Sequence, residues 1–419
     1  MSATRTRSTK ASEVRRVFPD PRELRHYLVP RVPPLKPTRR RLTRSLTIED
    51  LRREARRRVP RSVFDYTDGA ADQEISYRRA RAAFDAVEFR PRVLQNVSSV
   101  DTSCTIFGST LAQPFVFAPT GFTRMMHHAG EPAVARVAQR RGIGYTLSTM
   151  GTTSIEDVAA AAPDVTRWFQ LYVSRDRELS TSLMHRAREA GYSALMLTVD
   201  VPTGGSRLRD TRHGYGFPPR LALRSYADGM RHPAWTYNFL TTPPLAFASM
   251  GGTAGDLANH MSRLFDPEMT IDDLAWIRRE WDGPLIVKGV QSVADARALA
   301  DVGVDGIVLS NHGGRQLDRA VTPLMMLPEV SDAVGDRVTL GIDSGVMTGA
   351  DIAASLALGA SFALIGRAYL YGLMAGGEPG VDRAAEILST ELERTMKLLG
   401  ARRLADLDRE LVRLPAHSA

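Results

Sequence analysis

The amino-acid sequence predicts an α/β fold, and within that class a (β/α)8 TIM barrel. Three observations support this prediction. From residue 113 onward, short apolar or β-branched runs alternate with stretches of helical periodicity. Eight strand–helix pairs follow one another, the number that closes a barrel of parallel strands. Polar residues follow all eight strands, at the end where barrels carry their chemistry. The alternation alone also fits an open, doubly wound sheet, which is the alternative.

The predicted strands are short and apolar because the strands of a parallel barrel are covered on both faces. In chain order they are Phe115–Ala118, Ile143–Leu147, Thr166–Leu171, Ala194–Val199, Leu285–Lys288, Gly306–Leu309, Val338–Ile342 and Phe362–Ile365. The predicted helices are Glu131–Arg141, Ile155–Ala161, Glu178–Ala190, Ile271–Glu280, Val293–Val302, Pro323–Val334, Gly349–Leu358 and a last one from about Val381.

Capping residues mark several helix ends. Ser154 and Thr270 offer hydroxyl groups just before acidic first turns, so helices are expected to start after them. Glycines follow four of the predicted helices, at the position that favours a left-handed residue: Gly142, Gly191, Gly303 and Gly359.

Two segments lie outside the eight strand–helix pairs. Residues 47–112 form a helical lead-in, and residues 206–269 form an insertion after the fourth strand that is too long for a plain loop. The chain therefore divides into a basic leader at 1–46, a barrel domain at 47–410 and a C-terminal tail at 411–419.

Basic charge is concentrated in the leader. The chain carries a net charge of +8, but residues 1–44 contain 13 Lys/Arg and 3 Asp/Glu, so the rest of the chain sums to −2. A Pro/Arg-rich segment of this kind buries too little apolar surface to fold alone, so disorder is expected. A solvated tail, a nucleic-acid arm and a patch that contacts anionic lipid are the three interpretations.

The overall composition is that of an ordinary globular protein. Hydrophobic residues make up 43% and charged residues 24%, and no apolar run reaches the roughly 20 residues of a membrane span. Cys104 is the single cysteine, which excludes an internal disulfide and fits a reducing compartment. We expect a cytoplasmic protein, or one held peripherally on the inner face of the cell membrane.

The run Ser310–Asp318 is the most informative stretch of the chain. Gly313 and Gly314 let the backbone turn tightly and approach a ligand closely. His312 is suited to proton transfer near neutral pH, and Arg315 to a bidentate grip on a carboxylate. A plain surface turn is the alternative. The crowding of these residue types after a strand predicts a general base and an anion-binding cation at one rim.

Several motifs together resemble the FMN-dependent α-hydroxy-acid dehydrogenase/oxidase family. They are Ala118–Gly121, Trp168–Tyr172, Leu197–Asp200, Val287–Gly289, Ser310–Asp318 and Ile365–Arg367. The resemblance runs in order from about residue 47 to 410. It is closest to the bacterial quinone-linked L-lactate dehydrogenases, on the segments Arg207–Asp210, Trp276–Gly283 and Ala368–Tyr371.

The resemblance implies roles for individual residues around the substrate. His312 would be the base and Asp200 the carboxylate that holds it and stabilises its imidazolium. The substrate would be bound through its carboxylate by two arginines and through hydrogen bonds by two tyrosines: Arg207, Arg315, Tyr66 and Tyr172. His312 serves equally if a carbanion forms or if a hydride is transferred, so both routes are open.

The resemblance also implies a binding site for FMN. Lys288 would stabilise negative charge on the reduced ring, although a lysine at a strand end also fits a Schiff-base role. Other partners of the ring would be Pro119, Thr120, Gly121, Ser148, Gln170, Thr198 and Ser310. The phosphate would be held by Asp343, Ser344, Gly345, Gly366 and Arg367.

One position departs from the family pattern. The family usually carries an arginine two residues after Gly345, and this chain has Met347 there. One phosphate contact is therefore missing or comes from elsewhere in the chain.

The expected activity is FMN-dependent oxidation of a small L-2-hydroxy acid, for which L-lactate is the leading candidate. The electrons would then pass to a quinone or another carrier. The alternatives are an oxygen-using 2-hydroxy-acid oxidase, an FMN-dependent isomerase and a non-catalytic nucleic-acid binder. No metal is expected, since His127 and His128 lack further ligands at a suitable spacing. We expect no nucleic-acid partner and, by resemblance, a homo-oligomer such as a tetramer.

Overall fold

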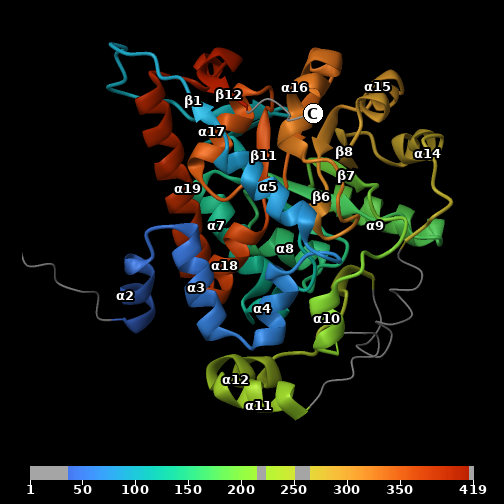
Figure 1. The fold of residues 1–419 in the computed structure, drawn as a ribbon. Helices are drawn as coiled ribbons and strands as arrows, with labels where there is room; N and C mark the ends of the chain where they lie inside the picture. Colours follow the sequence, from blue (N-terminus) through green and yellow to red (C-terminus); the bar gives the residue numbers. More distant parts are fainter. Residues whose placement is uncertain (1–35, 215–222, 251–264, 415–419) are drawn as a thin grey trace, which may run out of the picture. The chain divides into compact units, whose positions relative to one another are not determined.

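The computed structural model describes residues 36–214, 223–250 and 265–414 (Figure 1). The chain divides into two compact units, Met1–Arg40 and Arg41–Ala419, and the second contains all the strands. Most of the predicted leader lies outside the described residues. Residues 37–44 belong to helix α2 (Pro37–Arg44), so helical structure begins earlier than the sequence predicted.

Eight parallel strands close into a barrel, which confirms the (β/α)8 prediction and excludes the open sheet. Around the barrel the order is β10-β11-β4-β5-β6-β7-β8-β9. Their bounds fall within two residues of the predicted ones: β4 Phe115–Phe117, β5 Gly144–Ser148, β6 Arg167–Leu171, β7 Ala194–Thr198, β8 Leu285–Val290, β9 Gly306–Leu309, β10 Thr339–Ile342 and β11 Phe362–Ile365. The strands are buried on both faces, as their apolar sequences require.

The helices that follow the strands mostly match the sequence. They are α7 Gly130–Arg141, α8 Ile155–Ala161, α9 Arg177–Glu189, α14 Asp273–Glu280, α15 Val293–Asp301, α16 Pro323–Val334 and α17 Gly349–Ala357. Ser154 caps α8 as predicted, by accepting a hydrogen bond from the amide of Asp157. The cap predicted at Thr270 is wrong: the backbone amide of Thr270 donates to Asp273 instead, and Asp272 occupies the N-cap position of α14.

The last helix, predicted from about Val381, is present and begins at Glu378, but a further helix before it was not predicted. Two helices follow β11, α18 (Arg367–Gly376) and α19 (Glu378–Leu399), and they are separated at Gly377, whose φ is +64°. Helix α18 is buried along nearly all its length, so it lacks the polar face that makes a helix visible in a sequence.

The lead-in forms three helices, α3 (Ile48–Arg58), α4 (Arg61–Asp68) and α5 (Ile75–Asp85). Helix α3 begins at a capping box on Thr47 and packs on α18. A hairpin of β2 (Cys104–Ile106) and β3 (Ser109–Leu111) follows, and Phe107 at its tip contacts Trp168 and Phe362 inside the barrel. In the predicted tail, β12 (Val412–Arg413) pairs with β1 (Glu88–Phe89).

The described parts of the insertion are helical. They comprise α10 (Leu208–Arg212), α11 (Leu223–Arg231), α12 (Pro233–Thr241) and the 3-10 turn η1 (Ala248–Met250). Helices α11 and α12 lie together next to α4 and α10, at the bottom of the view in Figure 1. The rest of the insertion, at 215–222 and 251–264, lies outside the described residues.

Candidate active site

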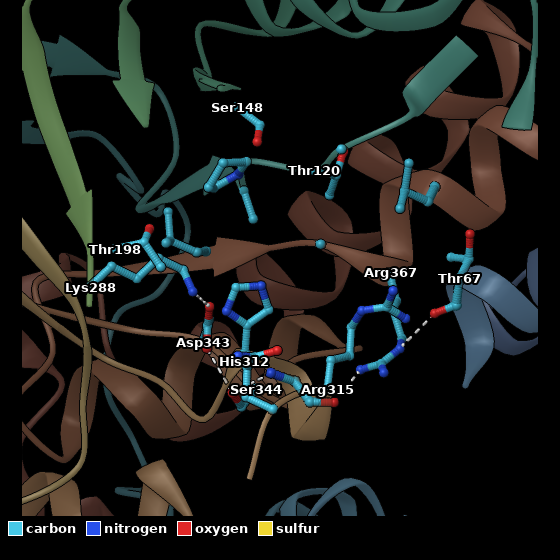
Figure 2. Close-up of a pocket in the computed structure, with 18 of the residues that line it drawn as sticks. Thr67, Thr120, Ser148, Thr198, Lys288, His312, Arg315, Asp343, Ser344 and Arg367 are labelled. Carbon is cyan, nitrogen blue, oxygen red and sulfur yellow. Dashed lines mark hydrogen bonds and ion pairs between the residues drawn. The ribbon is translucent and has the colours of Figure 1, made fainter. Parts of the chain in front are cut away.

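One cavity at the carboxyl ends of the strands collects nearly all the residues that the sequence singled out. Figure 2 shows His312 at its centre, with Lys288 and Asp343 to one side, Arg315 and Arg367 to the other, and Thr120 and Ser148 opposite. The predicted residues that line it are Tyr66, Pro119, Thr120, Gly121, Ser148, Tyr172, Thr198, Arg207, Lys288, His312, Arg315, Asp343, Ser344, Gly345, Gly366 and Arg367. Asp200, Gln170 and Ser310 do not line the cavity and instead contact residues that do.

The imidazole of His312 is oriented by Asp200. Its Nδ1 lies 3.1 Å from Asp200 Oδ1 and 3.3 Å from Oδ2. Burial raises the pKa of Asp200, but the charges of His312 and Lys288 outweigh burial and hold that pKa below its usual value. An ionised carboxylate only accepts hydrogen bonds, so Nδ1 is the donor to Asp200 and Nε2 faces Tyr172 and the cavity.

The backbone around His312 is held in an uncommon conformation. His312 has φ of +57°, and the two following glycines have φ of +64° and +76°. Asn311 Oδ1 accepts a hydrogen bond from the amide of Gly314, and Ser310 Oγ accepts one from the amide of His312. A non-glycine residue in the left-handed region is costly, and such residues concentrate at functional sites.

Two arginines crowd together beside the base. The guanidinium carbons of Arg207 and Arg315 lie 5.7 and 5.0 Å from the ring centre of Tyr66. Burial and the neighbouring charges of Arg207 and Arg367 lower the pKa of Arg315 to about 10. Arg315 is still a cation at neutral pH, but its charge is poorly compensated, so the cluster favours an anionic ligand.

The hydroxyl of Tyr172 points toward the same centre, 3.5 Å from Nε2 of His312. Burial and the charge of Asp200 raise the pKa of Tyr172 far above its usual value, so the phenol stays protonated and can donate a hydrogen bond. The ring packs edge-on against Phe265 and belongs to a small apolar cluster with Val201 and Met150. This part of the cavity therefore combines one hydrogen-bond donor with apolar walls.

Lys288 is a buried cation at the end of β8. Its Nζ lies 2.9 Å from Asp343 Oδ2 and donates to Ser310 Oγ at 2.9 Å. Burial lowers the pKa of Lys288, but the charges of Asp343 and Asp200 raise it above the usual value overall. A lysine that stays protonated is unsuited to Schiff-base chemistry, which needs the neutral amine. The geometry instead favours charge stabilisation of a group in the cavity.

The predicted phosphate residues line two sides of the cavity: Asp343 lies beside Lys288, and Arg367 lies on the side of Arg315 (Figure 2). Ser344, with φ of +72°, accepts hydrogen bonds from the amides of Asn311 and Gly313 and donates to Asp343 Oδ1, so it ties the β9 and β10 loops together. The guanidinium of Arg367 donates to three carbonyl groups, those of Thr67, Gly313 and Gly69, at 2.8 to 3.0 Å.

Sequence reasoning missed several residues of the site. Gln316 fixes the loop after β7, because its amide bonds the carbonyls of Asp200 and Thr203 and the amide of Gly205. Thr67, Tyr77 and Arg81 also line the cavity. The last three come from the lead-in, whose helical pattern gives no local sign that it faces the strand ends.

Comparison with known proteins identifies the family. A family model described as FMN-dependent dehydrogenase matches residues 55–414. The chain belongs to this family. A protein of Mycobacterium tuberculosis named "Putative L-lactate dehydrogenase" is 51% identical over 394 residues, which cover 94% of this chain and 95% of that protein. The L-lactate dehydrogenase of Caulobacter vibrioides is 42% identical over 370 residues, 87% of this chain and 96% of its own.

Solved structures agree with this assignment. A crystal structure of (S)-mandelate dehydrogenase, described as a monotopic membrane protein, superposes with a TM-score of 0.84 at 36% identity. The match covers 88% of this chain and 99% of that one. A mandelate oxidase matches with a TM-score of 0.77, also at 36% identity, over 88% of this chain and 98% of its own.

Membership of the family makes FMN the cofactor, and the cavity fits a flavin. Among the described residues, Gln170 Nε2 and Thr198 Oγ1 are buried without a hydrogen-bond partner, and both sit at strand ends beside the cavity. Buried polar atoms are rarely left unpaired, so they indicate a polar ligand edge. Oε1 of Gln170 accepts from Ser148 Oγ at 2.9 Å, which directs the amide group toward this edge. The described residues contain no cluster of three or more metal-ligating side chains.

Proposed function

We propose that this FMN-dependent dehydrogenase oxidises a small L-2-hydroxy acid, with L-lactate as the first candidate, to the 2-oxo acid. Two electrons and two protons leave the substrate in this reaction, and bound FMN supplies the acceptor for the electrons. The observation that carries the proposal is the convergence of a free imidazole nitrogen and two crowded arginines on one cavity. The relatives named L-lactate dehydrogenase support the choice of substrate.

His312 is the proton acceptor in this proposal. With Nδ1 held by Asp200, Nε2 faces the cavity and takes a proton from the substrate. The imidazolium that forms is stabilised by the ionised carboxylate of Asp200, whose lowered pKa keeps it charged. Tyr172 lies 3.5 Å from Nε2 and is placed to donate to the substrate oxygen as the proton moves.

Arg207 and Arg315 are proposed to bind the substrate carboxylate, next to the ring of Tyr66 that both guanidinium groups approach. A carboxylate there would offset the burial and the charge of Arg207 that together lower the pKa of Arg315. The substrate side chain would lie toward the apolar surface of Met150, Val201 and Phe265. An apolar substituent, such as the methyl group of lactate, suits that surface.

Anaerobic mixing with a panel of 2-hydroxy acids tests the proposal. We expect L-lactate to bleach the flavin absorbance faster than glycolate or mandelate, and the D-isomer to leave it unchanged. No bleaching by any L-2-hydroxy acid would overturn the proposal and favour an FMN-dependent isomerase. Turnover in air separates the remaining candidate, because an oxygen-using oxidase releases stoichiometric peroxide and a dehydrogenase needs an added quinone or dye.

We propose that the quinone or other carrier is reached at an anionic membrane surface. No helix of the described residues is long and apolar enough to cross a membrane. Helices α11 and α12, however, expose apolar side chains, with Met230, Tyr237 and Leu240 at 74, 69 and 74%. The basic leader is the second candidate contact, and residues 1–35 of it lie outside the described part. The monotopic membrane character of the (S)-mandelate dehydrogenase supports this proposal.

Vesicle sedimentation tests the membrane proposal. The intact protein is expected to bind vesicles that contain phosphatidylglycerol more than vesicles of phosphatidylcholine alone. Deletion of residues 1–35 and the double change Tyr237→Ser/Leu240→Ser should each weaken binding, whereas exposed Leu398→Ser on α19 should not. Binding that is unchanged in both variants would contradict the proposal.

We also propose that the protein forms a homo-oligomer, a tetramer by resemblance to the family. Light scattering, which measures the mass of the particle in solution, would test this proposal.

A further inference from the structure

Helix α5 approaches the phosphate end of the cavity directly. Gly345 has φ of +106°, and a Cβ there would lie 3.1 Å from Ala80 Cβ and 3.2 Å from the Ala80 carbonyl oxygen. The N-terminus of α5 is held by Asp318, whose carboxylate accepts from the amides of Gln73 and Ser76 at 3.1 and 2.8 Å. The end of the Ser310–Asp318 run thus positions α5 against the turn after β10.

This close approach places Arg81 where the family arginine is missing. Arg81 and Met347 line the same cavity, beside Gly345. Nη1 of Arg81 donates to the Gly345 carbonyl oxygen at 2.5 Å and to Asp351 Oδ2 at 2.6 Å. The second terminal nitrogen, Nη2, bonds Asp85, whose carboxylate is 68% exposed and therefore screened by solvent.

Arg367, on the Arg315 side of the cavity, already uses each of its three guanidinium nitrogens on a backbone carbonyl. Arg367 donates to the carbonyls of Thr67, Gly313 and Gly69, and its guanidinium stacks on the ring of Tyr77 at 4.7 Å. Asp351, the partner of Arg81, also accepts from the amides of Met347 and Thr348. The carboxylate of Asp351 thus divides its hydrogen bonds between Arg81 and the turn. Nη1 and Nη2 of Arg81 have partners, but among the described residues its Nε has no acceptor, so this donor is available to a second anion.

We propose that Arg81 supplies the cation that holds the FMN phosphate, in place of the arginine that the family carries at position 347. Arg81 reaches the turn from a helix 264 residues earlier in the chain than Gly345. A guanidinium fixed by Gly345 and Asp351 is oriented before the cofactor arrives, so little side-chain entropy is lost on binding. The inference rests on FMN as the cofactor and is independent of which substrate is oxidised.

Binding of FMN and of riboflavin to the apo-protein tests this role, measured by quenching of flavin fluorescence. Riboflavin carries the same ring without the phosphate. Arg81→Met is expected to weaken the binding of FMN about 10- to 100-fold, which is the usual contribution of a hydrogen bond to a charged group. The affinity for riboflavin should not change. Arg79→Met, on an exposed position of the same helix, is the matched control and should change neither.

The double variant Arg81→Met/Met347→Arg is the decisive one. It is expected to recover at least tenfold of the lost FMN affinity, because it restores the family arrangement at position 347. If Arg81→Met does not fold, Arg81→Lys retains the charge and should bind FMN with intermediate affinity and riboflavin normally.

Two outcomes would overturn the inference. Equal losses for FMN and riboflavin in the Arg81 variants would mean that the ion pair with Asp351 has only a structural role. A wild-type apo-protein that binds FMN no more tightly than riboflavin would mean that no cation reaches the phosphate. Neither outcome depends on hydroxy-acid turnover, so failure of this inference and failure of the proposed activity are distinguishable.

Discussion

At the reaction end of the cavity, the base and the arginines come from the loops after β9 and β7, close to the strands that hold them: His312, Arg315, Asp200 and Arg207. At the end of the cavity proposed for the phosphate, the turn after β10 supplies backbone and Ser344, and the cation that contacts this turn, Arg81, comes from α5 in the lead-in. His312 and Arg315 thus belong to a loop of the barrel itself, whereas Tyr66 and Arg81, one at each end of the cavity, come from the lead-in outside the barrel.

Because of this difference, substitutions at the two ends should have separate effects, one on the reaction with substrate and the other on the binding of FMN. A substitution at the reaction end removes a group that acts on the substrate and leaves the contacts of the cofactor in place. A substitution of Arg81 weakens cofactor binding, and the enzyme saturated with FMN should then turn over normally. The predictions below test this separation, from the largest expected effect to the smallest.

His312→Ala should have the largest effect. His312 is the only histidine among the described residues that line the cavity. Its loss removes the proposed proton acceptor, and flavin reduction by L-lactate should slow by about 10⁴-fold. Rapid mixing under anaerobic conditions measures this rate, and the visible spectrum provides the control for retained FMN. Loss of the flavin in this variant would contradict the separation of the two ends.

Asp200→Asn should slow flavin reduction by roughly 10²- to 10⁴-fold, because the amide no longer fixes the proton on Nδ1 of His312. The folded-state pKa of Asp200 is lowered, so its contribution to stability is present above its unfolded pKa near 3.9 and is lost as pH falls through the lower folded value. Urea unfolding should therefore give the wild type a larger free energy of unfolding than the variant at pH 7, and this difference should shrink toward pH 2. A difference that persists at pH 2 would refute the ionised state of Asp200.

Arg315→Met should raise the KM for L-lactate by about 10²-fold, with a smaller loss in kcat, because a buried charged partner of the carboxylate is removed. The same change lifts the repulsion between the two arginines, so Arg207→Met and Arg315→Met should combine to less than the product of their single effects. Steady-state kinetics of the two single variants and the double variant measure this coupling. Fully multiplicative effects would show that the two arginines do not share one carboxylate.

Gly121→Ala should have the smallest effect. A Cβ at Gly121 would lie 2.9 Å from Met150 Cβ, so Met150 must shift within the substrate side of the cavity. Because Cβ moves only with the backbone, the loop that carries Met150 must shift slightly, and we expect kcat/KM for L-lactate to fall by about tenfold. The affinity for FMN is the control. If this affinity changed more than kcat/KM, the added methyl group would disturb the cofactor site rather than the substrate side of the cavity.

Much of the fold could be predicted because barrel strands carry their signal locally. Each strand is a short apolar run that ends in a polar residue, and the Ser310–Asp318 run shows its histidine, glycines and arginine together. The misses have a different cause. Helix α18 is buried on nearly every side and lacks an amphipathic pattern, and α5 reads as an ordinary charged helix although Arg81 faces the cavity.

The sequence by itself predicted the strands in their order along the chain and a candidate base with its arginine, and it shows that position 347 is not an arginine. Only the tertiary structure decided what lies opposite Met347. The closure of the barrel and the capping of α5 by Asp318 bring Ala80 and Arg81 onto Gly345. The physical reason is that a sequence motif contains only residues close together in the chain. The contact between Arg81 and Gly345 joins residues 264 positions apart, so it forms only when the chain has folded.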